Sequence, residues 1–467
     1  MQWPVKRLRR VREAKEEVLE ERPRITEDRV LASYTITPVR YILYLDDDNW
    51  IRMAYIEPLP PGSDVMRDLV NGVREPANIV EAYHLAKAKS GYGPIYPLLT
   101  DPHIEEIAVN GPGRGVSVIH RHYPARWIGV DVELGEDEAD SLAIQLARKA
   151  GRMVSLAVPI AEGLTEEGHR VAVTFSREVS RHGSSFIIRK YPEKPMTIAD
   201  MIGSRILTPL MAAYLWILVE AQSFLIIIGN MGSGKTTLLQ SLADLIPPYH
   251  RVVTVEDTPE LRLQNPHWDP LITRPRPPGE EIEDIGLEDL LRFSLRRRAE
   301  HIIVGEVRGR EARLLAQAAA SGHGSLTTFH ADSPEGAILR LRLDPINLPP
   351  LFLRIVTGFI HIRRIPVFGG RAKRRIVSIT EVYGDDLITV FKYNPLDDKH
   401  EPDTPGEVLK RSTRIHEAWS KLGFPTSSLE EELEDRASLL ESAAGLPPED
   451  VYRRVSLYYQ KKYGVSI

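Results

Sequence analysis

A glycine-rich segment has the residue types and the spacing that hold a phosphate group. It reads Gly229-Asn230-Met231-Gly232-Ser233-Gly234-Lys235-Thr236-Thr237 and matches the pattern GxxxxGK[ST]. The apolar run Phe224–Ile228 precedes it, and the helix-compatible run Thr237–Leu245 comes after it. Glycines let backbone N–H groups face the β- and γ-phosphates, and a helix N-terminus adds positive potential. We therefore predict a nucleotide phosphate loop in which Lys235 neutralises phosphate oxygens and Thr236 offers its hydroxyl to Mg²⁺.

Acidic side chains follow two further apolar runs. Glu256 and Asp257 come after Val252–Val255, and Glu306 comes shortly after Ile302–Val304. Because ligands bind outside the carboxyl ends of strands in an open parallel sheet, we expect these acids to face the phosphate loop. Glu306 and Glu256 are expected to hold Mg²⁺ through water or to orient the attacking water. Asp257 can instead cap the turn that comes after it.

Two histidines belong to the same part of the sequence. His330 follows the apolar run Leu326–Phe329, and His323 lies between Gly322 and Gly324. A histidine near the γ-phosphate can sense its presence and move a neighbouring element. The alternative is that each histidine is a structural residue with its hydrogen bonds satisfied. Two histidines without further obvious ligands do not support a zinc site.

Arginines are concentrated just before the strand that leads to Glu306. A helix-like segment there carries Arg292, Arg296, Arg297 and Arg298. Like charges on one helix repel, so these side chains either form a solvated face or reach phosphates, in this subunit or in a neighbour. An arginine supplied across an interface makes hydrolysis depend on assembly. Arg170 and Arg189 could reach the same site if the preceding domain folds over it.

The elements that must position these residues are indicated by periodicity and turn signals. Residues 201–345 alternate apolar runs with helix-like segments, which indicates a mostly parallel α/β sheet. Earlier in the chain, Tyr34–Leu45 and Trp50–Ile56 predict a hairpin, and residues of about 95–200 predict a second α/β unit. Residues 401–467 predict a helical tail, in which Ser428–Glu431 has the spacing of a capping box.

Two charged segments have simple interpretations. A basic hairpin around residues 368–371 carries charges that are most simply a solvated face, namely Arg363, Arg364, Lys373, Arg374 and Arg375. The first residues combine the basic Lys6–Arg12 with the mostly acidic Glu13–Glu21. That arm is either a solvated terminus or a docking segment for an acidic partner or lipid headgroups.

Composition excludes several classes of protein. The 467 residues suggest about three domains. They include 60 basic and 65 acidic residues, so the net charge of −5 does not fit a strongly basic nucleic-acid binder. The absence of cysteine excludes disulfides, cysteine-ligated metals and thiol catalysis. The longest apolar stretch, Leu210–Val219, is shorter than the roughly 20 residues of a membrane span. We expect a cytoplasmic protein whose contact with a membrane is peripheral.

Four sequence boxes together resemble the secretion ATPase superfamily, which drives type II and type IV secretion, type IV pili and archaella. The boxes are Walker A (Gly229–Thr237), an Asp box (Thr254–Glu260), a Walker B that ends in Glu (Ile302–Arg308) and a His box (Ser321–Asp332). The resemblance covers residues of about 95–400 and is densest over 224–343. Further segments look most like the archaeal branch, namely Thr258–Leu261, Ser294–Arg298, Leu429–Arg436 and Val455–Tyr463.

The resemblance implies roles for individual residues. Glu306 would be the Walker-B glutamate and Glu256 the Asp-box acid. Arg296 or Arg298 would reach phosphates. Arg170 and Arg189 would approach the nucleotide from the N-terminal domain, while His323 and His330 belong to the His box. The cysteine cluster of many bacterial relatives is absent, so no zinc is expected.

The resemblance also implies a fold and a function. It implies a RecA-like P-loop NTPase core, a smaller α/β N-terminal domain and a helical C-terminal tail. The expected segments are 1–94 (N-terminal extension), 95–198 (N-terminal α/β domain), 199–400 (RecA-like ATPase domain) and 401–467 (helical tail). We predict a hexameric motor that uses ATP and Mg²⁺ and acts on a polytopic membrane platform protein, without nucleic acid. The alternatives are a hexameric nucleic-acid translocase and a non-catalytic nucleotide-binding module.

Overall fold

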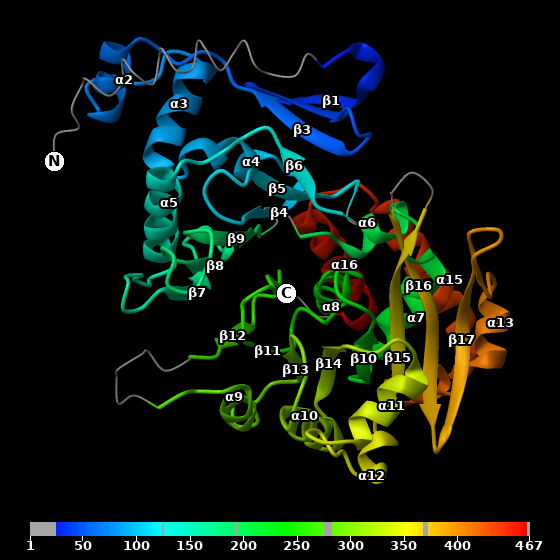
Figure 1. Ribbon diagram of the computed structural model, residues 1–467. Coiled ribbons are helices and arrows are strands. Elements are labelled where there is room, and N and C mark those ends of the chain that lie inside the picture. The colour runs from blue at the N-terminus through cyan, green and yellow to red at the C-terminus, as the bar shows by residue number, and fades with distance from the viewer. Residues whose placement is uncertain (1–24, 124–125, 192–194, 275–282, 368–371, 465–467) are drawn as a thin grey trace. The chain divides into compact units, whose positions relative to one another are not determined.

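The computed structural model describes residues 25–123, 126–191, 195–274, 283–367 and 372–464 (Figure 1). The charged segments Lys6–Arg12 and Glu13–Glu21 and the turn at residues 368–371 lie outside the described residues. The chain forms two compact units, Met1–Tyr191 and Pro192–Ile467. The expected division into four segments stays a prediction. Within the first unit, a single sheet contains strands from both sides of residue 94.

The first unit is built on a nine-stranded sheet with the order β1-β2-β3-β6-β5-β4-β9-β8-β7. Its strands are β1 (Val30–Ile36), β2 (Val39–Leu45), β3 (Ile51–Ile56), β4 (Ile104–Val109), β5 (Val116–His120), β6 (Ile128–Val130), β7 (Ile160–Leu164), β8 (Arg170–Thr174) and β9 (Ser185–Arg189). The predicted hairpin between Tyr34–Leu45 and Trp50–Ile56 is confirmed in the antiparallel pair β2–β3. The prediction that Tyr34–Leu45 forms one strand is wrong, because a turn at Thr37-Pro38 separates β1 from β2.

Helices cover this sheet through their apolar faces. They are α2 (Ser63–Val70), α3 (Ile79–Ser90), α4 (Tyr96–Thr100) and α5 (Glu136–Lys149), with the 3₁₀ turns η1 (Glu27–Arg29) and η2 (Gly93–Ile95). On α5, Ala139, Leu142 and Leu146 recur at helical spacing. They share one core with Val171 of β8 and Ile188 of β9.

The second unit contains a mixed nine-stranded sheet with the order β12-β11-β13-β14-β10-β15-β16-β17-β18. Its parallel part, from β12 to β15, is followed by antiparallel β16, β17 and β18. The strands are β10 (Phe224–Ile228), β11 (Val252–Glu256), β12 (Trp268–Ile272), β13 (His301–Val304), β14 (Gly324–Phe329), β15 (Gly358–Pro366), β16 (Ala372–Tyr383), β17 (Asp386–Asn394) and β18 (Lys399–Glu401). The predicted α/β fold with a RecA-like parallel core is confirmed.

Helices pack on both faces of this second sheet. Core contacts place on one face α6 (Ile198–Gly203), α7 (Pro209–Glu220), α8 (Lys235–Ala243), α13 (Pro405–Arg411), α14 (Arg414–Lys421), α15 (Leu429–Ser442) and α16 (Pro448–Tyr463). The other face carries α9 (Leu287–Ser294), α10 (Glu311–Ala320), α11 (Pro334–Arg342) and α12 (Pro350–Leu353). Strand β10 serves both cores, because Leu225 and Ile227 face the first and Phe224, Ile226 and Ile228 face the second.

The C-terminal helices enclose α7, which explains the longest apolar run of the sequence. Every residue of Leu210–Val219 is buried. Among the helices that the structure describes, none combines the length and the apolar character needed to cross a membrane. The tail is helical as predicted, with the 3₁₀ turn η3 (Thr426–Ser428) before α15.

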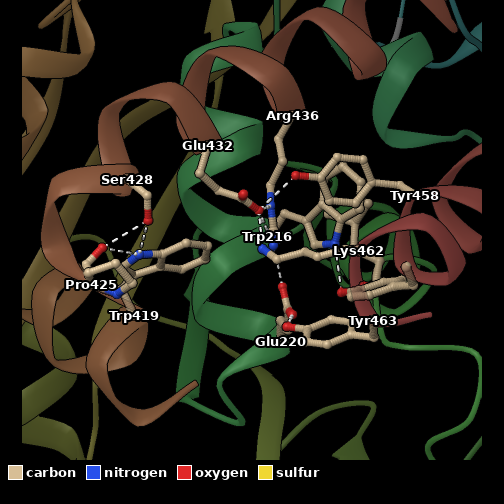
Figure 2. Close-up of polar contacts among 12 residues, drawn as sticks. Trp216, Glu220, Trp419, Pro425, Ser428, Glu432, Arg436, Tyr458, Lys462 and Tyr463 are labelled. Atoms are coloured by element: carbon tan, nitrogen blue, oxygen red, sulfur yellow. Dashed lines mark hydrogen bonds and ion pairs between the residues drawn. The ribbon is translucent and has the colours of Figure 1, made fainter. Parts of the chain in front are cut away.

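The capping box predicted at Ser428–Glu431 is wrong. Ser428 has helical backbone angles, whereas an N-cap residue is normally extended. Its hydroxyl donates to the carbonyl oxygen of Pro425 (2.8 Å) and accepts from Trp419 Nε1 (3.2 Å) (Figure 2).

Candidate nucleotide site

The phosphate loop lies between β10 and α8, and its shape requires glycine at three positions. Gly229, Gly232 and Gly234 have φ angles of 155°, 70° and 100°, a region that side chains other than glycine rarely adopt. A Cβ atom at Gly229 would also collide with the carbonyl oxygen of Ile362 on β15. Helix α8 begins directly at Lys235, so its N-terminus faces the loop. The sequence prediction therefore agrees with the backbone geometry.

Polar groups inside the loop suit an anionic ligand. The Lys235 side chain is 8% exposed and its ammonium lies 3.2 Å from the carbonyl oxygen of Asn230. The hydroxyl of Ser233 is buried and has no hydrogen-bond partner among the residues that the structure describes. Thr236 is half-buried in the first turn of α8. A glycine cradle, a buried lysine and an unsatisfied hydroxyl fit the phosphate groups of a nucleotide.

Glu306, His330 and Lys235 form a chain of contacts across three strand ends. His330 Nε2 lies 3.0 Å from Glu306 Oε1, and His330 Nδ1 lies 3.4 Å from Lys235 Nζ. An ammonium group can only donate, so Nδ1 accepts and the imidazole proton lies on Nε2, the ring nitrogen nearer Glu306. Arg308 Nη2 also donates to Glu306 Oε2 at 2.6 Å. The expectation that Glu306 and His330 lie beside the loop agrees with this geometry.

The charges around this chain lower the pKa values of both His330 and Glu306. Burial and the neighbouring Lys235 charge lower the pKa of His330, which is therefore neutral at pH 7. Burial alone would raise the pKa of Glu306. The hydrogen bond from Arg308 and the charges of Arg308, His330 and Lys235 outweigh that effect and lower it. Glu306 is consequently a carboxylate that can accept a proton from water or bind a hydrated cation.

Glu256 is the last residue of β11 and has a different environment. Its carboxylate accepts backbone hydrogen bonds from Glu260 (2.9 Å) and Leu261 (3.2 Å). Glu256, not Asp257, therefore caps the turn after the strand. Burial raises the pKa of Glu256 to about 7. Gly305 provides space for this side chain, because a Cβ there would lie 3.2 Å from Glu256 Cγ.

Three residues expected at the nucleotide lie at the opposite edge of the parallel sheet. His323 directly precedes β14, and Arg296 and Arg298 precede β13, so all three are at amino ends of strands. Nδ1 of His323 lies 2.7 Å from the carbonyl oxygen of Ala299. The structure does not bring His323 to the phosphate loop of its own chain, which corrects its expected role there. The expectation that Arg296, Arg297 and Arg298 lie on a helix is also wrong, because residues 295–298 form a turn after α9.

Arg170 and Arg189 belong to the first unit, on neighbouring strands. They lie directly opposite each other in the β8–β9 register. Arg170 pairs with Glu162, and Arg189 Nε lies 4.0 Å from Glu106 Oε1. Their proposed approach to the nucleotide stays a prediction.

Several positively charged side chains at the site were not identified from the sequence. Arg308 is one of them, and it belongs to the site because it donates a hydrogen bond to Glu306. An Arg340 side chain on α11 donates to the carbonyl oxygen of His330. Arg374 Nε donates to the carbonyl oxygen of Gly232 at 3.4 Å. The interpretation of the basic hairpin as a solvated face is therefore wrong for Arg374. The signal that could have identified Arg374 is its position opposite Arg364 on the neighbouring strand. That position becomes visible only when the strand register is known.

Comparisons with known proteins identify the family. The family model described as "Type II/IV secretion system protein" matches residues 92–344, more than half of the chain. Two uncharacterised proteins of Methanocaldococcus jannaschii are 36% and 37% identical, over 68% and 57% of this chain. The chain spans 58% of the length of the first and 98% of the second. The type IV secretion system protein VirB11 of Brucella suis is 32% identical over 54% of this chain and 75% of VirB11.

Solved structures of similar proteins include a type IV secretion system ATPase and a pilus retraction motor. The crystal structure of the Brucella suis VirB11 ATPase in complex with sulphate is 28% identical, covers 63% of this chain and 94% of that chain, and has a TM-score of 0.32. The structure of the pilus retraction motor PilT with bound ADP is 18% identical, covers 73% and 95%, and has a TM-score of 0.42. The family assignment rests on the matched residues 92–344 and on the sequence relatives. The chain belongs to the family of type II/IV secretion system proteins.

Proposed function

We propose that this chain is an ATP-hydrolysing motor that powers a type IV pilus-like filament, an archaellum or a secretion system. In this proposal it works as a homo-hexamer at the cytoplasmic face of the membrane, against a polytopic membrane protein. Hydrolysis changes the arrangement of its two units, and the hexamer converts these changes into sequential strokes. Family membership supports the class of machine, and the site chemistry supports the reaction.

The observation that carries the proposal is the continuous contact Lys235–His330–Glu306. It joins a residue of the phosphate loop to a carboxylate at the end of β13 through one imidazole. A γ-phosphate that attracts Lys235 competes with its contact to His330. That competition frees the imidazole to reorient Glu306. Arrival of the phosphate is thereby linked to the residue that positions water.

Each residue has a defined task in this reaction. Lys235 and the loop amides bind the phosphate tail of ATP, and Glu306 accepts a hydrogen bond from the attacking water. Mg²⁺, when bound, neutralises charge on the phosphate oxygens. Thr236, with Glu306 and Glu256 through water, would hold that ion. Oxygen donors of this kind suit Mg²⁺, although Glu256 also has to serve the amides of Glu260 and Leu261.

The test combines activity with assembly. ATPase rate is measured against protein concentration with Mg²⁺, together with light-scattering mass with and without a non-hydrolysable ATP analogue. A steep rise in specific activity and a mass near that of six chains support the shared-site motor. A concentration-independent rate from a monomer contradicts it. Activity that depends on added single-stranded DNA favours a translocase, and binding without turnover favours a regulatory module.

A pair of lysine variants checks the phosphate loop itself. Lys235→Ala removes the buried loop cation, so ATP binding is expected to be lost in equilibrium titration. Lys399→Ala removes the same charge from an exposed position of β18 and should bind ATP like the unchanged protein. Normal ATP affinity in Lys235→Ala contradicts the assignment of the loop.

A further inference from the structure

The β15–β16 hairpin lies along the outer side of the phosphate loop. A Cβ atom at Gly229 would meet the Ile362 carbonyl oxygen of β15. A Cβ atom added at Gly232 would have Arg364 Nη1 as its nearest neighbour, at 3.5 Å. A Cβ atom added at Gly234 would lie nearest to Arg374 Cδ, at 3.4 Å. All three glycines of the loop therefore lie close to the hairpin, two of them beside β15 and Gly234 beside both strands. The loop is bounded by this hairpin as well as by its own strand and helix.

The strand register brings two guanidinium groups to this boundary. Arg364 and Arg374 lie directly opposite each other in the antiparallel β15–β16 pair. Side chains directly opposite each other in an antiparallel pair are close enough to contact the same group. Arginine also has the planar set of donors that matches phosphate. The hairpin therefore places two guanidinium groups beside a loop built for phosphate.

The neighbouring residue Arg375 fixes the position of this pair. Its buried guanidinium binds Asp398 through Nε (3.0 Å) and Nη2 (3.1 Å). Hydrogen bonds from Arg375, Tyr393 and Lys373 hold the pKa of Asp398 well below its usual range. Because side chains alternate along a strand, anchoring Arg375 on one face directs Arg374 to the other, toward the loop.

A single hydrogen bond shows how Arg374 acts on the loop. Its Nε donates to the carbonyl oxygen of Gly232 at 3.4 Å. In a trans peptide the carbonyl and the next N–H point in opposite directions. The N–H of Ser233 accordingly points into the loop, where it donates to the carbonyl oxygen of Asn230 at 3.2 Å. Arg374 thereby helps to fix the orientation of the Gly232–Ser233 peptide in the loop.

From these contacts we propose that Arg364 and Arg374 are nucleotide-positioning residues. Arg374 holds the Gly232–Ser233 peptide in its binding orientation, and both arginines add positive charge for the phosphate tail of a nucleoside di- or triphosphate. This inference rests on the proposed function, because it adds residues to the same nucleotide site. It assigns to the hairpin a role in affinity and not in the hydrolytic step.

The test separates affinity from turnover in the full-length chain. Dissociation constants for ATP and ADP, and kcat and KM for ATP, are measured for Arg374→Ala, Arg364→Ala and the double variant. Each single variant is expected to raise both dissociation constants about tenfold, the scale of one lost charge-assisted contact. Saturating kcat should stay within about threefold, because Glu306 and His330 are unchanged. The double variant should also show a weaker dependence of ADP affinity on salt.

Control variants exclude a general loss of structure. Arg363→Ala removes the same charge one position away, on the other face of β15, and should bind ADP normally. Arg374→Lys keeps the charge and should recover most of the affinity, which a role in packing alone would not predict. Circular dichroism and melting temperature check folding of every variant.

The outcomes distinguish this inference from the proposed function. If Lys235→Ala loses nucleotide binding while Arg374→Ala and the double variant bind ADP within twofold of the unchanged protein, the inference alone is wrong. If Lys235→Ala binds normally, the nucleotide site itself is wrong. If the affinity loss in Arg374→Ala persists in Arg374→Lys and also occurs in Arg363→Ala, the effect is structural and overturns the positioning role.

Discussion

The imidazole of His330 lies 3.0 Å from the carboxylate of Glu306 through Nε2. Its other nitrogen lies 3.4 Å from Lys235 Nζ. One side chain therefore connects the lysine of the phosphate loop to the carboxylate that we propose positions water. Since the lowered pKa of His330 leaves it neutral at pH 7, its proton lies on the side of Glu306.

Substitutions at His330 should affect turnover more than nucleotide binding. His330→Ala removes both contacts, so we expect kcat to fall about 100-fold, the lower range for a misplaced acid–base group. ATP affinity should change less than about threefold, because the loop amides and Lys235 remain. His330→Gln keeps an N–H group that can reach Glu306 and should recover much of the rate. Single-turnover kinetics measures this, and near-native turnover of the alanine variant would contradict the connection.

Arg298 and Glu306 should complement each other across subunits. Arg298 precedes β13 and Glu306 comes after it, so they lie at opposite edges of one sheet. If Arg298 serves the nucleotide of a neighbour, Arg298→Ala and Glu306→Gln should each be nearly inactive alone. In a random equimolar mixture, about a quarter of the sites combine an intact Glu306 with an intact neighbouring Arg298.

ATPase activity of the mixture is the measurement for this prediction. We expect about a quarter of the unchanged rate after co-assembly, against a background of each variant assayed alone. Arg296→Ala is tested in the same way, since it lies in the same turn. If the ATPase activity of the mixture does not exceed the summed activities of the two variants assayed alone, the essential arginine lies in the same subunit as Glu306, or elsewhere.

Local patterns predicted the part of the site that is contiguous in the chain. The run Phe224–Ile228, the phosphate loop and α8 succeed one another directly, so hydrophobic periodicity and glycine spacing were sufficient. Glu306 and His330 were predicted from strand direction alone. The same reasoning, applied to residues that precede a strand, would have placed His323 at the far edge.

The arginines of the hairpin required information that the sequence does not carry locally. Arg374 reaches Gly232 across 142 positions of sequence. That contact depends on the pairing of β15 with both β10 and β16. A register shift of one residue would have sent Arg374 to the other face of the sheet. Basic residues in a hairpin therefore predict a solvated surface until the register is known.

Glu256 should make stability depend on pH. Burial raises its pKa from 4.5 to about 7, so the folded state binds this proton more tightly than the unfolded chain does. The resulting stabilisation is fully present below pH 4.5 and is lost as pH rises through about 7, and it amounts to about 3 kcal/mol. Glu256→Gln stays neutral and keeps an oxygen for the two amides.

Denaturant unfolding at several pH values measures this difference. The stability of Glu256→Gln relative to the unchanged protein should rise by about 3 kcal/mol between pH 4.5 and pH 8. Asp244, whose pKa burial also raises to about 7, titrates in the same range but is present in both proteins. The difference between the two proteins therefore reports Glu256. A difference that is constant over this pH range would contradict the assignment.

Arg436 should be the most sensitive position of the C-terminal tail. Its guanidinium is fully buried and pairs with Glu220 at the end of α7 and, at 2.6 Å, with Glu432 (Figure 2). It also lies 4.7 Å from the ring centre of Trp216. Removing one partner of a buried pair leaves an uncompensated charge. We therefore expect Arg436→Met to lower the free energy of unfolding by about 3–5 kcal/mol.

The controls for Arg436 separate buried charge from a general effect of the substitution. Arg453→Met changes an exposed arginine of α16 and should shift stability by less than about 0.5 kcal/mol. Adding Glu220→Gln to Arg436→Met should recover part of the loss, because one uncompensated carboxylate is removed.

Helix α7, which the tail packs against, leads directly into β10 and the phosphate loop. The tail therefore stabilises the element that carries the site. Below the melting transition, however, ATP affinity of Arg436→Met should be unchanged, because Arg436 contacts no residue of the loop. An Arg436→Met protein as stable as Arg453→Met in guanidinium unfolding would show that this buried network does not hold the tail in place.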